Sequence, residues 1–144
     1  MISIKIKISL VAICAICIAS VCPAAFASTL YERLGGERTV AQFVSETVDL
    51  SAVDPKIKRS FDKVDLKKLK IKVAEQICAL TQGPCKYTGD DMKLAHQGLE
   101  LTEAEFYGFV DILRGTLNRA KVPESAKNEL LRILASMKRE IVQK

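Results

Sequence analysis

Apolar residues recur at steps of three and four along most of this chain, which is the period of an amphipathic helix. Four long segments carry the pattern: 37–53, 66–80, one that opens at Glu103, and a last one that opens at Pro123. No segment alternates apolar and polar residues over a length sufficient for a strand. The sequence therefore predicts an all-α fold, with very short helical turns between some of the long helices.

Local signals mark the ends of these helices. Asp54-Pro55 should end the segment 37–53, because proline disfavours helical geometry in the residue before it. Asp65 is the expected N-cap of the next helix, and Thr102-x-x-Glu105 is a capping box. The predicted core-facing residues are Val40, Phe43, Val44, Thr47 to Leu50, Leu66, Leu69, Val73, Ile77, Leu80, Phe106, Phe109, Val110, Leu113, Leu117, Leu130, Leu134, Met137 and Ile141.

The stretch 90–99 contains His96, the only histidine of the chain. With Asp90 as the N-cap of a short helix, Met92, His96 and Leu99 fall at i, i+4 and i+7 on one apolar face. Neutral imidazole is a common ligand of metal ions and haem iron, and an apolar wall keeps it neutral and excludes water. A histidine on an apolar face is also commonly a satisfied core residue, so this pattern alone leaves both interpretations open.

The first residues have the pattern of a secretory signal peptide. Lys5 and Lys7 form a basic start, residues 8–22 are uncharged, and Ala25 and Ala27 occupy the small-residue positions before a cleavage site. We expect a signal peptide over 1–27 and one domain over 28–144, exported and most simply periplasmic. The uncharged run is short for a spanning helix, which needs about 20 residues; an uncleaved membrane anchor is the alternative.

Net charge and cysteine content argue against a nucleic-acid partner and against covalent haem attachment. The formal charge of +5 falls to +3 without Lys5 and Lys7, too little to indicate a nucleic-acid partner. Three of the five cysteines leave with the signal segment, and no Cys-x-x-Cys-His haem attachment motif occurs. Cys78 and Cys85 remain. In an oxidising compartment they could pair, but their spacing does not decide between a disulfide and a buried Cys78 with Cys85 in a loop.

Three motifs together resemble those of the truncated haemoglobins. Leu30-Tyr31-Glu32-Arg33-Leu34-Gly35-Gly36 resembles the opening of that family, and Asp54-Pro55-x-Ile57-x-x-x-Phe61 resembles the end of its B helix and the following corner. The most specific motif, Gly83-Pro84-x-x-Tyr87-x-Gly89-x-x-Met92-x-x-Ala95-His96-x-x-Leu99, resembles the loop and the proximal histidine helix. The similarity covers 30–142 and is greatest to the first group, which implies a two-over-two helical sandwich, the truncated globin fold.

The resemblance implies a non-covalent b-type haem with His96 as the proximal iron ligand. Phe61 would pack flat on the porphyrin, although it could also be an ordinary core residue. Lys86 and Tyr87 would contact the haem edge and propionates, although Lys86 could equally be a surface lysine. The remaining residues expected on the proximal or inner side of the haem are Met92, Leu99, Phe106 and Phe109.

The distal side departs from the family pattern. Many members have an aromatic residue followed by tyrosine in the B helix and a glutamine early in the E helix, which donate hydrogen bonds to the bound gas. Alignment back from Phe61 places Thr47 and Val48 at the first two positions, and Leu69 and Val73 on the E helix. A donor to a charged acceptor is worth about 1.5–3 kcal/mol. Its loss predicts faster O₂ dissociation and easier oxidation of the ferrous protein.

Lys72 falls where some relatives place a residue that ligates the iron from the distal side. Its amine would have to be neutral, and burial can lower a lysine pKa of about 10.4 by about 3–5 units. The alternative is that Lys72 reaches the propionates or water, together with Lys67, Lys68 and Lys70.

Three hypotheses of function follow. The first is reversible binding of O₂, NO or CO opposite His96, as gas binding or transport rather than catalysis, because the missing distal tyrosine weakens NO dioxygenation. The second is a six-coordinate haem, with His96 and Lys72 as ligands, that transfers electrons or detoxifies NO. The third is a haem-free helical interaction module. We expect a reductase or other electron donor as the partner, no nucleic acid, and membrane contact only through the signal segment.

Overall fold

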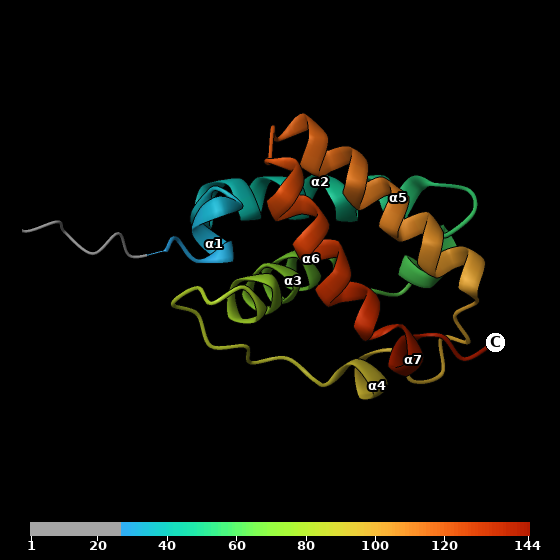
Figure 1. Cartoon of the computed structure of the whole chain (residues 1–144). Coiled ribbons are helices and arrows are strands. Elements are labelled where there is room, and N and C mark those ends of the chain that lie inside the picture. Colours follow the sequence, from blue (N-terminus) through green and yellow to red (C-terminus); the bar gives the residue numbers. More distant parts are fainter. Residues whose placement is uncertain (1–26) are drawn as a thin grey trace, which may run out of the picture.

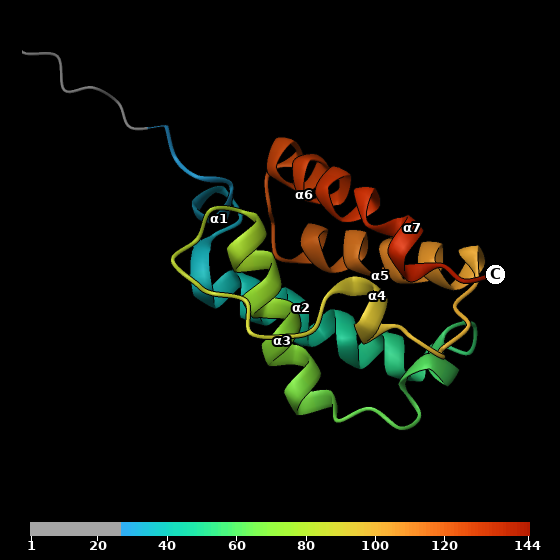
Figure 2. The same ribbon diagram turned by 90° about the horizontal axis from the view of Figure 1, so that it is seen from below.

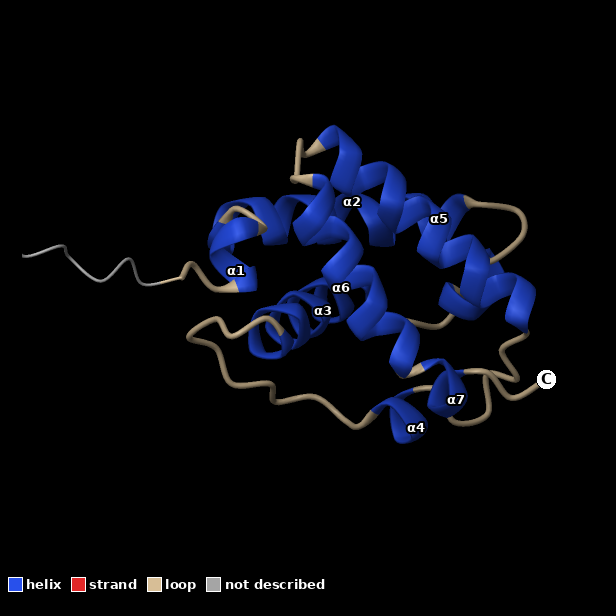
Figure 3. Ribbon diagram, viewed as in Figure 1, coloured by secondary structure: helices blue, strands red, loops and turns tan. Residues whose placement is uncertain are grey.

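The computed structural model describes residues 27–144, so the predicted signal segment falls outside the described residues except for Ala27. The described residues are helical and contain no strand, which confirms the all-α prediction (Figures 1 and 3). None of the helices in this part of the chain has the length and apolar composition needed to cross a membrane. The elements in order are α1 (Leu30–Arg33), α2 (Gly36–Val53), η1 (Lys58–Phe61, a 3₁₀ helix), α3 (Leu66–Leu80), α4 (Met92–Ala95), α5 (Glu103–Arg119), α6 (Glu124–Ser136) and α7 (Lys138–Ile141).

The four long helices are arranged as two pairs. Helix α2 packs against α3, and α5 packs against α6, while contacts between α2 and α5 join the pairs. Figure 2 shows α5 and α6 lying beside α2 and α3, with the short α4 next to α7. The two-over-two sandwich is therefore confirmed. Its fully buried core side chains include Phe43, Val44, Val48, Ile77, Leu117 and Leu130.

The predicted caps of α3 and α5 are confirmed. The side chain of Asp65 accepts hydrogen bonds from the backbone N–H groups of Lys67 and Lys68, at 3.0 and 3.1 Å. The Thr102 hydroxyl accepts from the Glu105 N–H, and the Glu105 carboxylate accepts from the Thr102 N–H. These caps satisfy amide groups that have no partner within the helix. They account for two helix starts that were correct to the residue.

The prediction for the histidine helix is wrong in its boundaries. Its N-cap is Asp91, whose side chain accepts from the Leu94 N–H at 2.7 Å. The backbone carbonyl of Asp90 instead accepts a hydrogen bond from the Tyr87 hydroxyl. Since two neighbouring aspartates can both serve as caps, only the course of the preceding loop decides between them. Helix α4 ends one residue before His96, which is its C-cap.

The last helix is not continuous as predicted. Pro123 is the N-cap rather than the first helical residue, and the helix breaks after Ser136. The break lets α7 pack against α4. Because no proline or glycine marks it, the apolar pattern alone predicts a single helix through this point.

Two leucines predicted to face the core are exposed instead. The exposed fraction is 39% for Leu50 and 38% for Leu80. An apolar stripe drifts around a helix of 3.6 residues per turn, so residues at the edge or end of the stripe can leave the buried face. Leu80 is the last residue of α3.

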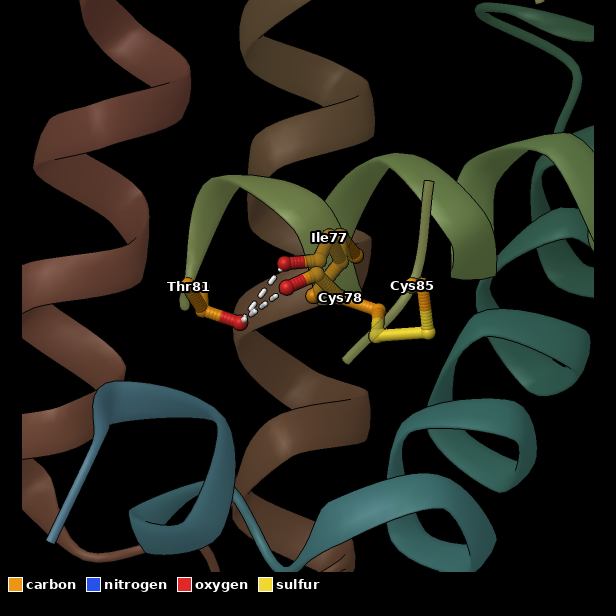
Figure 4. Close-up of a disulfide and its surroundings, with 4 residues drawn as sticks. All are labelled: Ile77, Cys78, Thr81 and Cys85. Atoms are coloured by element: carbon orange, nitrogen blue, oxygen red, sulfur yellow. Dashed lines mark hydrogen bonds between the residues drawn. A yellow bond between two sulfur atoms is a disulfide. The ribbon is translucent and has the colours of Figure 1, made fainter. Parts of the chain in front are cut away.

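Cys78 and Cys85 form a disulfide, with a Cα–Cα distance of 5.7 Å, so the pairing that the sequence left open is present (Figure 4). It joins the last turn of α3 to the loop that leads toward α4. The Thr81 hydroxyl donates to the Ile77 carbonyl at 2.6 Å and ends the helix beside it. A Cβ at Gly83 would lie 2.6 Å from the Cys78 sulfur, so only glycine allows the loop to turn this tightly.

Two glycines of α5 offer a matched test of packing. A Cβ at Gly108 would lie 2.8 Å from Cγ2 of Ile57, whereas a Cβ at Gly115 would meet only Nη1 of Arg119, at 3.6 Å. We predict that Gly115→Ala raises the free energy of unfolding by about 0.5–1 kcal/mol, since alanine is the better helix former. Gly108→Ala should lower it by about 1–3 kcal/mol through overpacking. Urea unfolding followed by circular dichroism measures both, and equal gains would contradict the close approach of Ile57.

Candidate functional site

A cavity of about 530 Å³ lies among α2, α3, α4 and α5, within the range of about 300–1,000 Å³ usual for small-molecule and cofactor pockets. Residues of η1, α6 and α7 complete its lining. Most of the lining side chains are apolar. An apolar cavity with a few polar groups is the usual form of a cofactor site.

The structure brings all but one of the predicted site residues to this cavity. Lys86 is exposed and does not line the cavity. Its side chain therefore lies at the surface, which was the alternative for this residue. The predicted residues that line the cavity are Val48, Phe61, Leu69, Lys72, Val73, Tyr87, Met92, His96, Leu99, Phe106 and Phe109.

The imidazole of His96 is oriented by its own helix. Nδ1 lies 2.8 Å from the backbone carbonyl oxygen of Met92, one turn earlier. In the neutral ring this contact requires the proton on Nδ1, which leaves Nε2 with its lone pair. No hydrogen-bond partner for Nε2 occurs among residues 27–144, and the ring lines the cavity. A backbone contact that fixes one nitrogen and leaves the other free is the arrangement of metal-ligating histidines.

The segment that follows His96 is held from two sides. Gln143, near the C-terminus, donates from its side chain to the His96 carbonyl at 3.1 Å and accepts from the Glu100 N–H at 2.7 Å. Arg59 of η1 donates to the carbonyls of Leu99 and Glu100, both at 3.0 Å. Both side chains come from elements distant in sequence, so the position of His96 depends on the fold and not on α4 alone.

Arg59 also joins this segment to α5 through an ion pair with Glu105, at 2.5 Å. Glu105 is only 7% exposed, and its carboxylate accepts from both the N–H and the hydroxyl of Thr102. Burial raises the pKa of Glu105, but the hydrogen bonds from Thr102 and Arg59 outweigh burial and leave the pKa below its usual range. Sequence reasoning identified Glu105 as a capping residue only, and missed Arg59 and Gln143, because neither long-range contact leaves a local pattern.

Thr47 and Val48 of α2 and Leu69 and Val73 of α3, the residues expected on the distal side, all line the cavity. Thr47 is the hydroxyl-bearing residue of this set, which we call the distal wall. Its Oγ1 lies 2.7 Å from the Phe43 carbonyl and 2.7 Å from the Thr116 hydroxyl, which itself donates to a carbonyl of its own helix. Two hydroxyl protons serve these three contacts, so Thr47 has none left to donate into the cavity.

Two further polar groups lie in the lining. The Gln76 amide donates to the sulfur of Met92 at 3.1 Å, which connects α3 to α4. The Ser60 hydroxyl is buried and has no hydrogen-bond partner within the described residues. Ser60 belongs to η1, and the Gln76 amide has a second N–H for which no partner is found within the described residues, so the lack of a free donor holds for Thr47, Val48, Leu69 and Val73 only.

The rim of the cavity is polar and charged. The Lys72 ammonium pairs with Glu75 at 2.9 Å and contacts the Thr88 hydroxyl, which also donates to Glu75 at 2.8 Å. These hydrogen bonds, first that of Lys72 and then that of Thr88, hold the pKa of Glu75 below its usual range. Tyr87 lies beside them, and burial together with Asp90 raises the pKa of its hydroxyl. Lys72 would have to leave this ion pair before it could reach the interior.

Comparison with known proteins agrees with this geometry. Residues 29–143 match the family model of the bacterial-like globins. The chain is 26% identical to a group 1 truncated haemoglobin of Tetrahymena pyriformis over 116 residues, which cover 81% of this chain and 96% of the relative. It is 30% identical to a group 1 truncated haemoglobin of Mycolicibacterium paratuberculosis over 114 residues, which cover 79% of this chain and 84% of the relative.

Solved structures show the same arrangement of helices. The Fe(III) form of the Tetrahymena pyriformis truncated haemoglobin matches with a TM-score of 0.77 at 26% identity, over 81% of this chain and 100% of that chain. The 2/2 haemoglobin of Synechococcus sp. PCC 7002 matches with a TM-score of 0.75 at 24% identity, over 81% and 100% of the two chains. The second likeness supports the fold alone.

Removal of Arg59 tests how the segment after His96 is held. Because the pKa of Glu105 lies below its unfolded value of about 4.3, its contribution to stability is present above that value and is lost as pH falls through the folded pKa. We predict that Arg59→Met raises the pKa of Glu105 and lowers the free energy of unfolding by about 1–3 kcal/mol. The midpoint of acid unfolding, followed by circular dichroism, should move to higher pH.

Two further variants control this experiment. Lys58→Met removes an exposed positive charge one residue earlier and should leave the acid midpoint unchanged. Arg59→Met/Glu105→Gln removes both partners of the pair and should restore most of the acid stability, since no buried charge is left without its partner. An acid midpoint in Arg59→Met equal to that of the parent protein would contradict the ion pair.

Proposed function

The chain belongs to the bacterial-like globin family and has the truncated two-over-two fold, and from this premise we propose that it binds haem b non-covalently through His96. The observation that carries the proposal is the orientation of that one imidazole. Its Nδ1 contacts the Met92 carbonyl at 2.8 Å, and its free Nε2 belongs to a ring that lines a largely apolar cavity of about 530 Å³. The cofactor supplies an iron at which a diatomic gas binds reversibly.

The lining residues fit a flat, mainly apolar group with charged substituents. Apolar side chains that include Phe61, Phe106 and Phe109 would contact the macrocycle and keep water from the imidazole. Lys72 and Tyr87, at the polar rim, would face the propionates. The sequence has no Cys-x-x-Cys-His motif, which agrees with a non-covalent haem.

Gas selectivity follows from the distal wall. Bound O₂ carries more negative charge than bound CO or NO, so it gains more from a hydrogen-bond donor. A hydrogen bond to a charged acceptor is worth about 1.5–3 kcal/mol. Val48, Leu69 and Val73 have no donor, and the Thr47 hydroxyl is already bonded to backbone and to Thr116. We infer that CO and NO are favoured relative to O₂.

The rim favours an open sixth coordination position. Lys72 could ligate iron only as a neutral amine, yet in the structure its ammonium pairs with Glu75 and contacts Thr88. Breaking this pair and removing the proton both cost free energy. The gas-binding hypothesis is therefore better supported than the six-coordinate alternative.

Export of the protein and an electron donor complete the proposal. The Cys78–Cys85 disulfide supports export, because disulfides persist in oxidising compartments. A basic and then uncharged segment before residue 28 supports a signal peptide, and membrane contact would be confined to that segment. Ferrous protein without a distal donor should oxidise readily, so a reductase or other electron donor is required to restore it.

Haem binding is tested by absorption spectra of the purified protein in its ferric, ferrous and CO-bound states. We predict a Soret band, a five-coordinate ferrous spectrum and ready CO uptake. His96→Gly should lose haem on gel filtration and recover it when imidazole is added, whereas Gln97→Ala, next in sequence, should retain haem. A colourless protein that resists reconstitution, or His96→Gly with unchanged haem content, would overturn the assignment.

The distal wall is tested by the rate of O₂ dissociation, measured by stopped flow. Leu69→Gln introduces an amide of similar size and should slow dissociation by about tenfold or more, while Leu69→Met, without a donor, should change it by less than about twofold. Val48→Tyr should slow it as well, because the phenol supplies a hydrogen-bond donor. Faster dissociation in Ser60→Ala would show that η1 supplies a donor, against the inference drawn here.

A further inference from the structure

The charges of the chain are distributed unevenly. Segment 56–72, from the turn before η1 to the middle of α3, carries eight basic and two acidic residues, a net charge of +6. The rest of residues 27–144 carries 12 basic and 15 acidic residues, a net charge of −3. The small net charge of the domain therefore hides one strongly basic region. Its basic residues are Lys56, Lys58, Arg59, Lys63, Lys67, Lys68, Lys70 and Lys72.

Three of these eight residues are neutralised by acids outside the segment. Their ion pairs are Arg59–Glu105, Lys70–Asp49 and Lys72–Glu75. The other five are exposed, and no ion pair is found for them with any residue from 27 to 144. These five lysines lie within 13 consecutive residues and outnumber the two exposed aspartates there, Asp62 and Asp65, and the excess creates a positive potential that extends about 10 Å into solvent at moderate salt. These five are Lys56, Lys58, Lys63, Lys67 and Lys68.

The same region lies at the edge of the cavity. Val64 and Lys68, and the η1 residue Phe61, all line it. Figure 2 shows this edge as the green ribbon that runs through η1, the following loop and the first turns of α3. Two aliphatic side chains are exposed among the lysines, Val64 at 37% and Ile71 at 59%. We call the five free lysines, Val64 and Ile71 together the lysine face.

We propose that the lysine face is the docking surface for an acidic electron-transfer protein that reduces the ferric haem. This inference rests on the proposed function. A partner with a reduced flavin or iron–sulfur centre loses one electron there and is oxidised, and the ferric haem is reduced to the ferrous form, with no bond made or broken and no proton moved. Opposite charge would steer the encounter, and Val64 and Ile71 would supply apolar contact.

The chemistry of the lysine face favours a protein over an anionic membrane. Faces that bind membranes usually add tryptophan or tyrosine to their lysines. This chain has no tryptophan, and the lysine face contains no aromatic residue. A bilayer on this side would also cover the part of the cavity lining that Val64 and Lys68 form.

The test uses the haem-loaded protein and a reduced flavodoxin, an acidic one-electron flavoprotein, as the probe. Lys56→Glu/Lys63→Glu/Lys67→Glu changes three residues of the lysine face that do not line the cavity. The matched control Arg38→Glu/Lys121→Glu/Arg132→Glu makes the same change of net charge at exposed positions elsewhere. Binding is measured by calorimetry at about 20 and about 200 mM salt, and reduction of the ferric protein by stopped flow.

We expect the parent protein to bind flavodoxin with an affinity that falls at least about tenfold at the higher salt. The lysine-face variant should lose about tenfold or more in affinity and in reduction rate, and the control less than about threefold. Reduction by dithionite should be unchanged in both variants. Equal losses in the two variants would show an effect of net charge only and overturn the proposal.

Two other results separate the possible failures. Sedimentation with phosphatidylglycerol vesicles but not phosphatidylcholine vesicles, lost in the lysine-face variant and without flavodoxin binding, would make this a membrane-binding surface and overturn the proposal. Haem content is measured first in every preparation. Absence of a Soret band would overturn the proposed function. A haem-loaded protein that neither binds flavodoxin nor is reduced by it would overturn the docking proposal alone.

Discussion

The hydrogen bond between Nδ1 of His96 and the Met92 carbonyl is the interaction on which the site depends. It fixes the tautomer of the ring, and with it the nitrogen that is free to bind a metal. The bond is local, since it spans one turn of a four-residue helix that could not persist in isolation. Helix α4 therefore has to be held from outside. The loop from the disulfide at Cys85 leads into it, and Arg59 and Gln143 hold the segment that follows.

The two sides of the cavity differ in structure: one is a short helix with its loop, and the other is made of two long helices. The side of His96 is a short helix and loop, fixed by side chains that come from η1 and from the C-terminus. The opposite side consists of α2 and α3, long helices whose positions are set by core packing. A hydroxyl does occur there at Thr47, but it bonds to Thr116 of α5 and so joins the two helix pairs. The Thr47 hydroxyl therefore stabilises the fold and is not free to donate into the cavity.

Many helix boundaries and cavity residues could be predicted from the sequence, because capping residues and fixed motif spacing are local features. Helix α3 was correct at both ends: Asp65 caps its start, and its apolar pattern stops at Leu80, just before the C-cap Thr81. The motif around His96 placed Tyr87, Met92, His96 and Leu99 on the cavity, and alignment around Phe61 placed Val48, Leu69, Lys72 and Val73 there. Contacts between residues distant in sequence produce no local sequence pattern, so they could not be predicted. Arg59 is one basic residue among eight in its segment, and only the structure shows that it, and not a neighbouring lysine, reaches Glu105. The pairing of Cys78 with Cys85 likewise needed the course of the loop.

The distribution of charge follows from the same division of roles. Without a hydrogen-bond donor to bound O₂, the ferrous form that we propose would oxidise readily, so the site would depend on electrons from outside. In the proposal those electrons enter at the rim of the cavity, which Phe61, Val64 and Lys68 border. On that rim Lys72 is already neutralised by Glu75, and its charge cannot attract a partner. Lys68, which also lines the cavity, and the exposed lysines before it in the sequence have no ion pair within the described residues and can attract a partner. Loss of a hydrogen-bond donor inside the cavity and the excess of positive charge at its edge are therefore two parts of one arrangement.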